Sequence, residues 1–536
     1  MDDEKNDRRD DSRSRFKFDV TWIIVLVQFI VILFLIIALF AYILSRPIEF
    51  QTTNSKTVKN HELRTLPDFT TITFRRRFKT STSTAATTTS SAKVDFSEDV
   101  NPQSESSENL DSFHAAVLSE SNICSEIGRS ILVRGGNAID SAISTSFCLM
   151  MAFPNKASLG GGMLLLVKES NGTMKTIMAR ETAPMNTDVN ELKKSPQLSI
   201  SGEKSIGVPG MLNGLFRAYE KFSSGRLSWK QLIIPVLQQC VKGFEYNQSI
   251  KNEVKMLAKN NPNATNILDC STLAMTLSDL IDYENPFDSV LYEKMSQYGY
   301  LSPADFEDYE SDLNNARCTT IDNDIKVCGP GPPSLFSVLV NSYSLTKNMS
   351  NIEKVNEVVK SNINSAYKIA DPIFYQLSRK FADDLMRSSK KSEYQKDLNV
   401  NFREDGSTMI TVIDENNMTV SLILSLGDNF GSEVLTSSGF FMNNKLRYFD
   451  LKSENQPLSL QPGKVPTTMI SPFIVLKNEQ VLAISGGSDI ISMVHLLRDL
   501  THRNYDASIA TPALYLSNSA ILLKSHPNNQ YSITGY

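Results

Sequence analysis

The sequence lacks the short motifs of several common catalytic and binding sites. It has no CxxC and no HExxH motif, and its five histidines are scattered along 536 residues. No Lys-Ser/Thr pair follows the glycine-rich loop at residues 158–162. These absences give little support to a zinc site, a Ser-His-Asp triad or a phosphate-binding loop. A formal net charge of −5 argues against general nucleic-acid binding. We therefore expect no metal, no cofactor and no nucleic-acid partner.

Proline, glycine and cysteine are also too few for several special classes of chain. With 21 Pro, 24 Gly and 6 Cys, the sequence is not collagenous, wholly disordered or saturated with disulfides. A hydrophobic content of 41% over this length is enough for a sizeable core. We expect a folded region of ordinary composition.

Long apolar runs are absent with one exception, residues 20–44. These 25 residues carry no formal charge, and as a helix they would extend roughly 37 Å, against about 30 Å for the hydrocarbon core of a bilayer. Basic residues from Arg8 to Lys17 precede the run and only Arg46 follows it closely, so the positive-inside rule places residues 1–19 in the cytoplasm. We predict a signal-anchor helix of a single-pass type II plasma-membrane protein, with the remaining chain extracellular.

Two further features fit an extracellular location. All six cysteines follow the apolar run, and their even number permits disulfides. We expect Cys318 and Cys328 to pair, whereas Cys148 lies in an apolar helical run and is expected to be a buried thiol. Five Asn-X-Ser/Thr sequons, which predict a glycoprotein, begin at Asn171, Asn247, Asn263, Asn348 and Asn417.

The extracellular chain divides into a stem and a globular part. Residues 45–108 are rich in Ser and Thr and poor in aliphatic side chains, which predicts an unfolded, O-glycosylated stem. Beyond it, helical and strand-like patterns alternate, and the last third is rich in strands, which indicates an α/β or α+β fold. Expected helices are Ser119–Val133 and Ala138–Ala152. Expected strands are Met163–Val167, Met409–Ile413, Thr419–Leu426, Gly439–Met442, Phe473–Leu476 and Val481–Ile484.

Several short motifs follow one another through the globular part. In order they are Arg134-Gly135-Gly136-Asn137-Ala138-Ile139-Asp140-Ser141-Ala142, Ser158-Leu159-Gly160-Gly161-Gly162, Ala179-Arg180-Glu181-Thr182-Ala183-Pro184, Gly207-Val208-Pro209-Gly210, Gly225-Arg226-Leu227-Ser228-Trp229, Leu301-Ser302-Pro303-Ala304-Asp305 and Gly329-Pro330-Gly331-Pro332-Pro333-Ser334. Each alone is ordinary helix punctuation or a loop. Together and in this order they resemble the γ-glutamyltransferase (glutathione hydrolase) family over roughly residues 111–536.

The resemblance implies a fold and a maturation step. The fold is an α+β N-terminal-nucleophile hydrolase, a four-layer αββα sandwich. Its precursor cuts itself before a hydroxyl residue, and here the matching stretch, Asp405-Gly406-Ser407-Thr408-Met409, places the nucleophile at Ser407. The chain would then divide into a large-subunit part, 109–406, and a small-subunit part, 407–536. A free α-amine with a pKa near 8 can serve Ser407 as general base.

The resemblance also assigns pocket residues one by one. Arg180 matches the arginine that clamps the glutamyl α-carboxylate, for which a planar guanidinium is well suited. Gly486 and Gly487 match the glycine pair whose N–H groups form the oxyanion hole. Thr467 and Thr468 match two serines that hold the same carboxylate, and Ser425 matches a threonine of the pocket. The implied donors are glutathione and other γ-glutamyl compounds, with water, an amino acid or a dipeptide as acceptor.

Three positions depart from the family pattern on the side that holds the substrate's ammonium. Gly427 stands where the family has Asn, and Lys445 and Tyr448 stand where it has Glu and Asp. A Lys ammonium about 4 Å from the substrate ammonium would repel it by roughly 4 kcal/mol at an effective dielectric constant of 20. Glutamyl recognition survives this change if Lys445 points to water or if Asp450 or Asp489 supplies a carboxylate.

Three functions remain open from the sequence. The first is a membrane-anchored glutathione hydrolase and γ-glutamyltransferase that works through a γ-glutamyl-Ser407 ester. The second is a catalytically impaired pseudoenzyme that acts as a binding or regulatory protein at the surface. The third is a hydrolase for an acyl group without the α-amine, such as a glutaryl group.

Overall fold

The computed structural model describes residues 114–261, 267–281, 290–364, 366–388, 402–501, 512–517, 520–524 and 532–535. The predicted cytoplasmic tail, the transmembrane helix at 20–44 and the stem at 45–108 lie outside these residues and stay predictions. Among the helices that the structure does describe, none combines the length and the apolar character that a membrane crossing requires.

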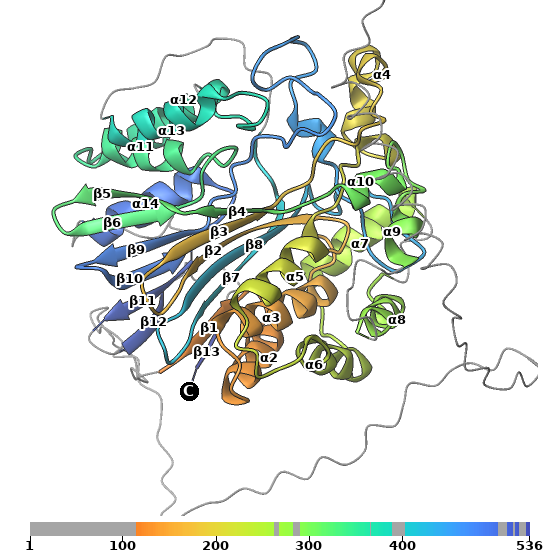
Figure 1. Ribbon diagram of the computed structural model, residues 1–536, viewed down its shortest axis with the longest axis horizontal. Coiled ribbons are helices and arrows are strands. Elements are labelled where there is room, and N and C mark those ends of the chain that lie inside the picture. Colours follow the sequence, from red (N-terminus) through yellow and green to blue (C-terminus); the bar gives the residue numbers. More distant parts are fainter. Residues whose placement is uncertain are drawn as a thin grey trace, which may run out of the picture. The chain divides into compact units, whose positions relative to one another are not determined.

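Two antiparallel β-sheets form the centre of the globular part (Figure 1). The seven-stranded sheet has the order β13 (Ser532–Gly535), β1 (Ala116–Ser119), β7 (Gly406–Ile413), β8 (Thr419–Gly427), β2 (Gly162–Lys168), β3 (Met174–Ala179) and β4 (Asp312–Asn315). The six-stranded sheet has the order β12 (Ala520–Lys524), β11 (Ala513–Ser517), β10 (Gln480–Ser485), β9 (Phe473–Lys477), β6 (Ile325–Gly329) and β5 (Arg317–Asp322).

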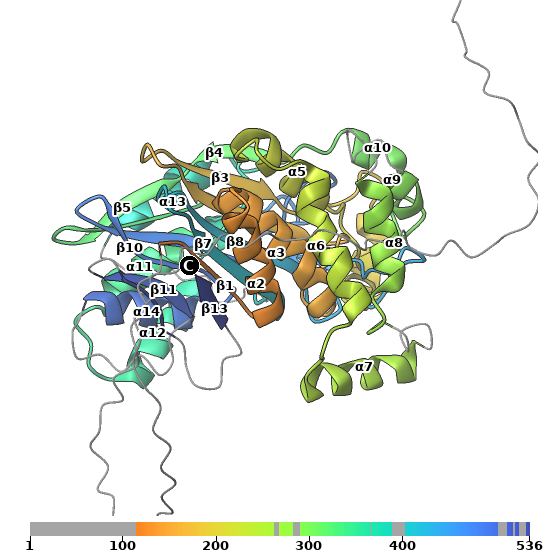
Figure 2. The same cartoon turned by 90° about the horizontal axis from the view of Figure 1, so that it is seen from below.

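Helices cover the outer face of each sheet (Figures 1 and 2). The seven-stranded sheet is covered by α2 (Asn122–Val133), α3 (Ala138–Ala152), α5 (Met211–Phe222) and α6 (Trp229–Lys242). The six-stranded sheet is covered by α11 (Phe336–Thr346), α12 (Ile352–Ile363), α13 (Leu377–Arg387) and α14 (Ile490–Thr501). The remaining helices surround one end, namely α4 (Val189–Lys194), α7 (Gln248–Asn260), α8 (Ser271–Leu280), α9 (Val290–Met295) and α10 (Pro303–Glu307).

Three hydrophobic clusters separate these layers. One fills the space between α2, α3, α5, α6 and the seven-stranded sheet, and another lies between the six-stranded sheet and its helices. The third lies between the two sheets, where Leu164 and Ile423 of one sheet pack with Ile474 and Ile484 of the other. Side chains of a strand alternate between faces, so the central strands β2, β7 and β8 are buried on both faces. The arrangement is the predicted four-layer αββα sandwich.

The helix predicted at Ala138–Ala152 is confirmed as α3. Asn137 accepts hydrogen bonds from the backbone N–H groups of Ile139 and Asp140, and Asp140 accepts one from Asn137, so α3 begins at Ala138 as expected. The predicted start of the preceding helix at Ser119 is wrong. Ala116–Ser119 forms β1, and Ser121 caps α2 instead.

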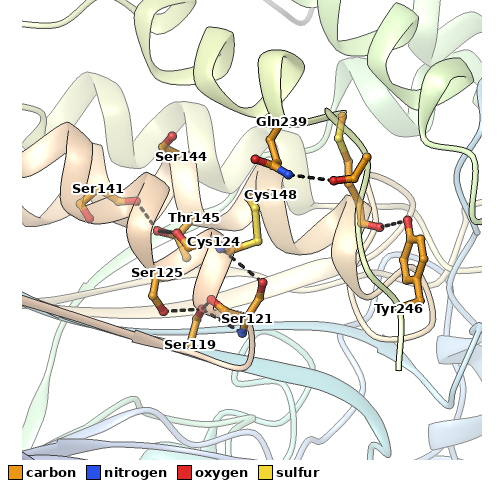
Figure 3. Close-up of a disulfide and its surroundings, with 12 residues drawn as sticks. Ser119, Ser121, Cys124, Ser125, Ser141, Ser144, Thr145, Cys148, Gln239 and Tyr246 are labelled. Carbon is orange, nitrogen blue, oxygen red and sulfur yellow. Dashed lines mark hydrogen bonds between the residues drawn. A yellow bond between two sulfur atoms is a disulfide. The ribbon is translucent and has the colours of Figure 1, made fainter. Parts of the chain in front are cut away.

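Three disulfides join the described cysteines. The predicted Cys318–Cys328 pair is confirmed across β5 and β6, and Cys240 pairs with Cys270. The expectation that Cys148 is a buried thiol is wrong, because it forms a disulfide with Cys124 where α2 and α3 lie side by side (Figure 3). A helical run of apolar residues indicated burial of Cys148 correctly, but it carried no information about the partner from the neighbouring helix.

Most predicted strands are present with ends extended by one to three residues. Thr419–Leu426 continues to Gly427 in β8, and Met409–Ile413 begins at Gly406 in β7. The strand predicted at Gly439–Met442 is wrong. Phe441 and Met442 make only isolated bridges, with Leu435 and Gly160 respectively, so this segment is a loop and not a strand.

Candidate active site

Ser407 lies at the start of β7, beside β8. Its residue partner across the two strands is Ser425, and the register shifts between Gly406 and Ser407. The backbone of Asp428 packs against Gly406, where an added Cβ would lie 2.0 Å from the Asp428 carbonyl oxygen, so only glycine fits immediately before Ser407. This close approach fixes the Gly406–Ser407 peptide at the edge of a buried strand.

The hydroxyl of Ser407 is held by two neighbouring groups. Its Oγ lies 2.9 Å from the backbone carbonyl oxygen of Glu404 and 2.9 Å from the Oγ of Ser488. Ser488 in turn donates a hydrogen bond of 2.8 Å to the same Glu404 carbonyl. The predicted nucleophile is therefore connected to the segment that immediately precedes it and to the loop between β10 and α14.

The side chain of Glu404 enters a cluster of hydrogen-bond donors. Nη2 of Arg180 lies 3.0 and 3.1 Å from its two carboxylate oxygens, and Oγ of Ser425 lies 2.6 Å from Oε2. Thr468 Oγ1 donates to Oε1, and Lys445 Nζ donates to Oε2. Glu404 has no exposed surface, and Arg180 and Lys445 are each 1% exposed. Three of the predicted pocket residues, Arg180, Ser425 and Thr468, thus meet around one carboxylate.

This cluster contains two cations and two carboxylates. Glu181, also without exposed surface, lies with Oε2 3.5 Å from Arg180 Nη2 and with Oε1 3.9 Å from Lys445 Nζ. Neither carboxylate oxygen of Glu181 has a hydrogen-bond partner, and the same is true of Nε and Nη1 of Arg180. The cluster is electrically balanced only when Glu404 is counted.

Burial and charge pairing act in opposite directions on these groups. Burial alone would raise the pKa of Glu404, but the charges of Arg180 and Lys445 outweigh it and lower the pKa to about 2. For Glu181, burial dominates over the attraction of Arg180 and Lys445, and its pKa is raised. Burial, with repulsion from Arg180, lowers the pKa of Lys445 despite its carboxylate neighbours. Glu404 is the firmly ionised carboxylate of the cluster.

Lys445 points into the cluster and not to water. It begins the short helix η6 (Lys445–Tyr448), where its backbone N–H donates to the side chain of Asn443 and its ammonium lies 5.2 Å from the centre of the Tyr448 ring. The two alternative carboxylates suggested by the sequence serve local turns. Asp450 accepts from the N–H of Lys452, and Asp489 accepts from the N–H of Ile491. The acidic partners of Lys445 are Glu181 and Glu404.

The glycine pair lies in the loop after β10, next to Ser488. Gly486 is buried, and a Cβ added to it would lie 2.9 Å from the Cα of Pro472 and 3.0 Å from a side-chain carbon of Ile423. Gly487 is partly exposed, and its carbonyl accepts a hydrogen bond from the N–H of Ser471. Close backbone packing of this kind requires glycine, as the predicted oxyanion hole does.

Two predicted pocket residues do not contact the Glu404 carboxylate, although the backbone N–H of Gly427 donates to Oγ of Ser425. The hydroxyl of Thr467 donates to the carbonyl of Ile369, 2.7 Å away, so it does not join the donors around Glu404. Gly427 has a φ of +101° and lies under the side chain of Asn444, whose Oδ1 would be 2.2 Å from an added Cβ. Their assignment to substrate binding stays a prediction.

Sequence reasoning missed Glu404, Glu181 and Ser488. Glu404 lies between exposed Arg403 and Asp405, and nothing in its local pattern distinguishes it from a surface residue. A useful signal was present in Lys445, because a cation in a buried pocket requires a counter-charge nearby. Within the described residues, no group of three His, Cys, Asp or Glu side chains is arranged to hold a metal ion.

Comparison with known proteins identifies the family of the chain. The family model described as gamma-glutamyltranspeptidase matches residues 124–520. Glutathione hydrolase 2 of Arabidopsis thaliana is 26% identical over 472 residues, which cover 75% of this chain and 80% of that protein. Glutathione hydrolase proenzyme 2 of Schizosaccharomyces pombe is 26% identical over 442 residues, covering 71% and 72%.

A solved structure shares the fold over most of its length. The cephalosporin acylase from Bacillus halodurans superposes with a TM-score of 0.66 at 16% identity, and the match covers 83% of this chain and 99% of that one. Because the family model spans most of the chain, from α2 to the last strands, the chain belongs to the gamma-glutamyltranspeptidase family.

Proposed function

We propose that the chain is a glutathione hydrolase and γ-glutamyltransferase that acts through Ser407 after a cut before this residue. The observation that carries the proposal is the carboxylate-binding cluster beside Ser407, made by Arg180, Ser425 and Thr468 around Glu404. A γ-glutamyl donor must present its carbonyl to a nucleophile and its α-carboxylate to cationic and hydroxyl donors. Family membership supports the same activity.

The spacing between the two parts of the site fits a glutamyl group. The main-chain carbonyl of Glu404 contacts the Ser407 hydroxyl, while its carboxylate lies among Arg180, Ser425 and Thr468. The carbon skeleton between these two ends is that of glutamic acid. A γ-glutamyl donor has the same skeleton between its γ-carbonyl and its α-carboxylate, so it spans the same distance in the reverse direction.

The proposed reaction begins with the cut. Ser407 Oγ attacks the carbonyl carbon of Gly406, the Gly406–Ser407 C–N bond breaks, and an ester forms. Water then hydrolyses the ester, which leaves the Gly406 carboxylate and a free α-amine on Ser407. That amine, with a pKa near 8, takes the proton of the Ser407 hydroxyl in later turnovers.

Turnover then follows the same acyl chemistry on the donor. Ser407 Oγ attacks the γ-carbonyl, the N–H groups of Gly486 and Gly487 stabilise the oxyanion, and the amine product leaves with the proton. Water, an amino acid or a dipeptide then attacks the γ-glutamyl-Ser407 ester, takes the γ-glutamyl group and regenerates the Ser407 hydroxyl. In this proposal Thr467 and Gly427 belong to the donor pocket. The anchor at 20–44 holds the chain in the plasma membrane, with the catalytic part outside the cell.

Denaturing gel electrophoresis with N-terminal sequencing tests the cut. We expect a fragment that begins at Ser407 in the wild type and none in Ser407→Ala, while Ser407→Thr retains the cut because it keeps the hydroxyl. An uncut wild-type chain would support the surface pseudoenzyme instead, since the proposed base is the liberated amine. Turnover of a γ-glutamyl anilide by the cut protein tests the second half of the proposal.

A specific observation favours a second candidate, hydrolysis of an acyl group without the α-amine. Lys445 is buried against the carboxylate of Glu404. By the family resemblance it stands where an acidic residue binds the substrate's ammonium. A glutaryl group keeps the carboxylate and lacks the repelled ammonium. Comparable kcat/KM values of the cut protein for γ-glutamyl and glutaryl anilides would favour this candidate.

A further inference from the structure

We infer that Glu404 is an internal ligand of the acyl pocket, which occupies the donor's carboxylate subsite in the uncut chain and thereby positions the Gly406–Ser407 bond for the cut. The inference rests on the proposed function, because it identifies that subsite with the cluster of Arg180, Ser425, Lys445 and Thr468. It adds a positioning residue for maturation and the expectation that the uncut chain binds no donor at this subsite.

The first argument is that Glu404 is anchored at both ends. Its carboxylate receives hydrogen bonds from four side chains, and its main-chain carbonyl receives one from Ser488 and lies 2.9 Å from Ser407 Oγ. The two neighbouring residues behave differently, since Arg403 and Asp405 pair with each other at the surface. The segment is thus held by the buried side chains of Phe402 and Glu404, and Glu404 is the residue of the two whose side chain enters the pocket.

The second argument concerns the length of the tether. Asp405 and Gly406 alone separate Glu404 from Ser407, and Gly406 packs without space against the carbonyl of Asp428. With Glu404 fixed on one side and β7 fixed on the other, the intervening peptide has little freedom. A reaction between a hydroxyl and the adjacent peptide carbonyl depends strongly on such preorganisation.

The third argument is charge. Without Glu404 the cluster keeps Arg180, Lys445 and Glu181, and the donors of Ser425 and Thr468 lose their acceptor. Such a cluster is one negative charge short, and buried cations require a partner. An entering carboxylate restores the balance, so Glu404 and a donor carboxylate compete for the same place.

The occupancy is tested in an uncut chain, where no turnover is needed. The background is the full-length Ser407→Ala protein, with and without Glu404→Ala, and the probes are glutarate and L-glutamate in a thermal-shift titration. We expect no shift for Ser407→Ala and a saturable rise in Tm with glutarate for the Glu404→Ala double variant. Equal shifts in both proteins, or no shift in the double variant, would overturn the inference that Glu404 occupies the subsite.

The positioning role is tested by the rate of the cut. In pulse–chase labelling we expect Glu404→Ala to form the Ser407 fragment at least tenfold more slowly than the wild type, and the matched neighbour Asp405→Asn to cut at the wild-type rate. If Glu404→Ala does not fold, Glu404→Gln keeps the shape and removes the charge. A rate for Glu404→Gln or Glu404→Ala equal to that of Asp405→Asn would refute positioning.

These outcomes can be separated from failure of the proposed function. If the wild type cuts but turns over no γ-glutamyl donor, the proposed function fails while the titration still reports whether Glu404 fills the subsite. If the wild type turns over the donor and the titration shows equal binding with and without Glu404, only the present inference fails.

Discussion

Four buried ionisable side chains, Arg180, Glu181, Glu404 and Lys445, set the charge beside Ser407. The motif around Arg180 predicted a residue that binds a carboxylate, and in the structure Arg180 contacts the carboxylate of Glu404. The departure at Lys445 was visible in the sequence. The direction of the Lys445 side chain was not, because a long flexible side chain reaches either water or a buried partner from the same position. Its partner Glu404 is 41 residues away in the chain.

Lys445→Met should change the preference between donors. Removal of the ammonium abolishes its repulsion of a donor's α-ammonium, so the ratio of kcat/KM for γ-glutamyl over glutaryl anilide should rise at least tenfold, or about 1.4 kcal/mol. The cut protein is assayed with both anilides, and Lys452→Met, at an exposed position nearby, is the control. An unchanged ratio in Lys445→Met would mean that Lys445 does not face the donor's amine.

The pH dependence of stability should reveal the ionised state of Glu404. Its pKa is lowered from 4.5 to about 2 in the folded uncut chain, because Arg180 and Lys445 outweigh the effect of burial. A lowered carboxyl pKa stabilises the fold fully above pH 4.5 and loses this contribution as the pH falls toward 2.

Urea unfolding of uncut Ser407→Ala, with and without Glu404→Gln, isolates this contribution. The difference between the two urea midpoints should be constant from about pH 5.5 to 7 and should shrink below pH 4.5. Because Glu181 is present in both proteins, its titration does not cause the difference. A difference that does not vary between about pH 5.5 and 3 would show that Glu404 is not ionised by its pairing.

At the scale of elements, local patterns predicted helices and strands better than their contacts. The Asn137 cap and an apolar run placed α3 correctly, and strand-like runs separated by a polar turn placed β7 and β8. The prediction of a strand at Gly439–Met442 is wrong because a short apolar run looks the same in sequence whether it forms a strand or only isolated bridges, here to Leu435 and Gly160. The sequence did not predict the Cys124–Cys148 disulfide for a similar reason, since the pairing depends on how α2 packs on α3.

Removal of the Cys124–Cys148 disulfide should destabilise the layer of α2 and α3. The bond closes a loop with a sequence separation of 24, and loop-closure entropy gives about 3 kcal/mol for a bridge of this length. Urea unfolding of the Cys124→Ser/Cys148→Ser double variant measures the loss. A change below about 1 kcal/mol would mean that the packing of α2 on α3 is sufficient without the covalent link.

At the scale of the whole molecule, the fragments on either side of the predicted cut each contribute strands to both sheets. Strands β1, β2, β3 and β4 precede residue 407 and share the seven-stranded sheet with β7, β8 and β13. Strands β5 and β6 precede it and share the other sheet with β9 to β12. The sequence predicted the sandwich through its resemblance, but not this interleaving, because strand order in an antiparallel sheet depends on non-local pairing.

This interleaving predicts that the two fragments remain one particle after the cut. Separation would break the pairings β1–β7, β2–β8 and β6–β9 and would expose the cluster between the sheets, which contains Leu164 and Ile423 from opposite sides of the cut. The cut protein should elute as a single peak in size-exclusion chromatography at neutral pH and should separate into two species only in denaturant. Uncut Ser407→Ala provides the reference elution volume. Elution of the two fragments at separate volumes without denaturant would contradict a shared core and would require each part to fold alone.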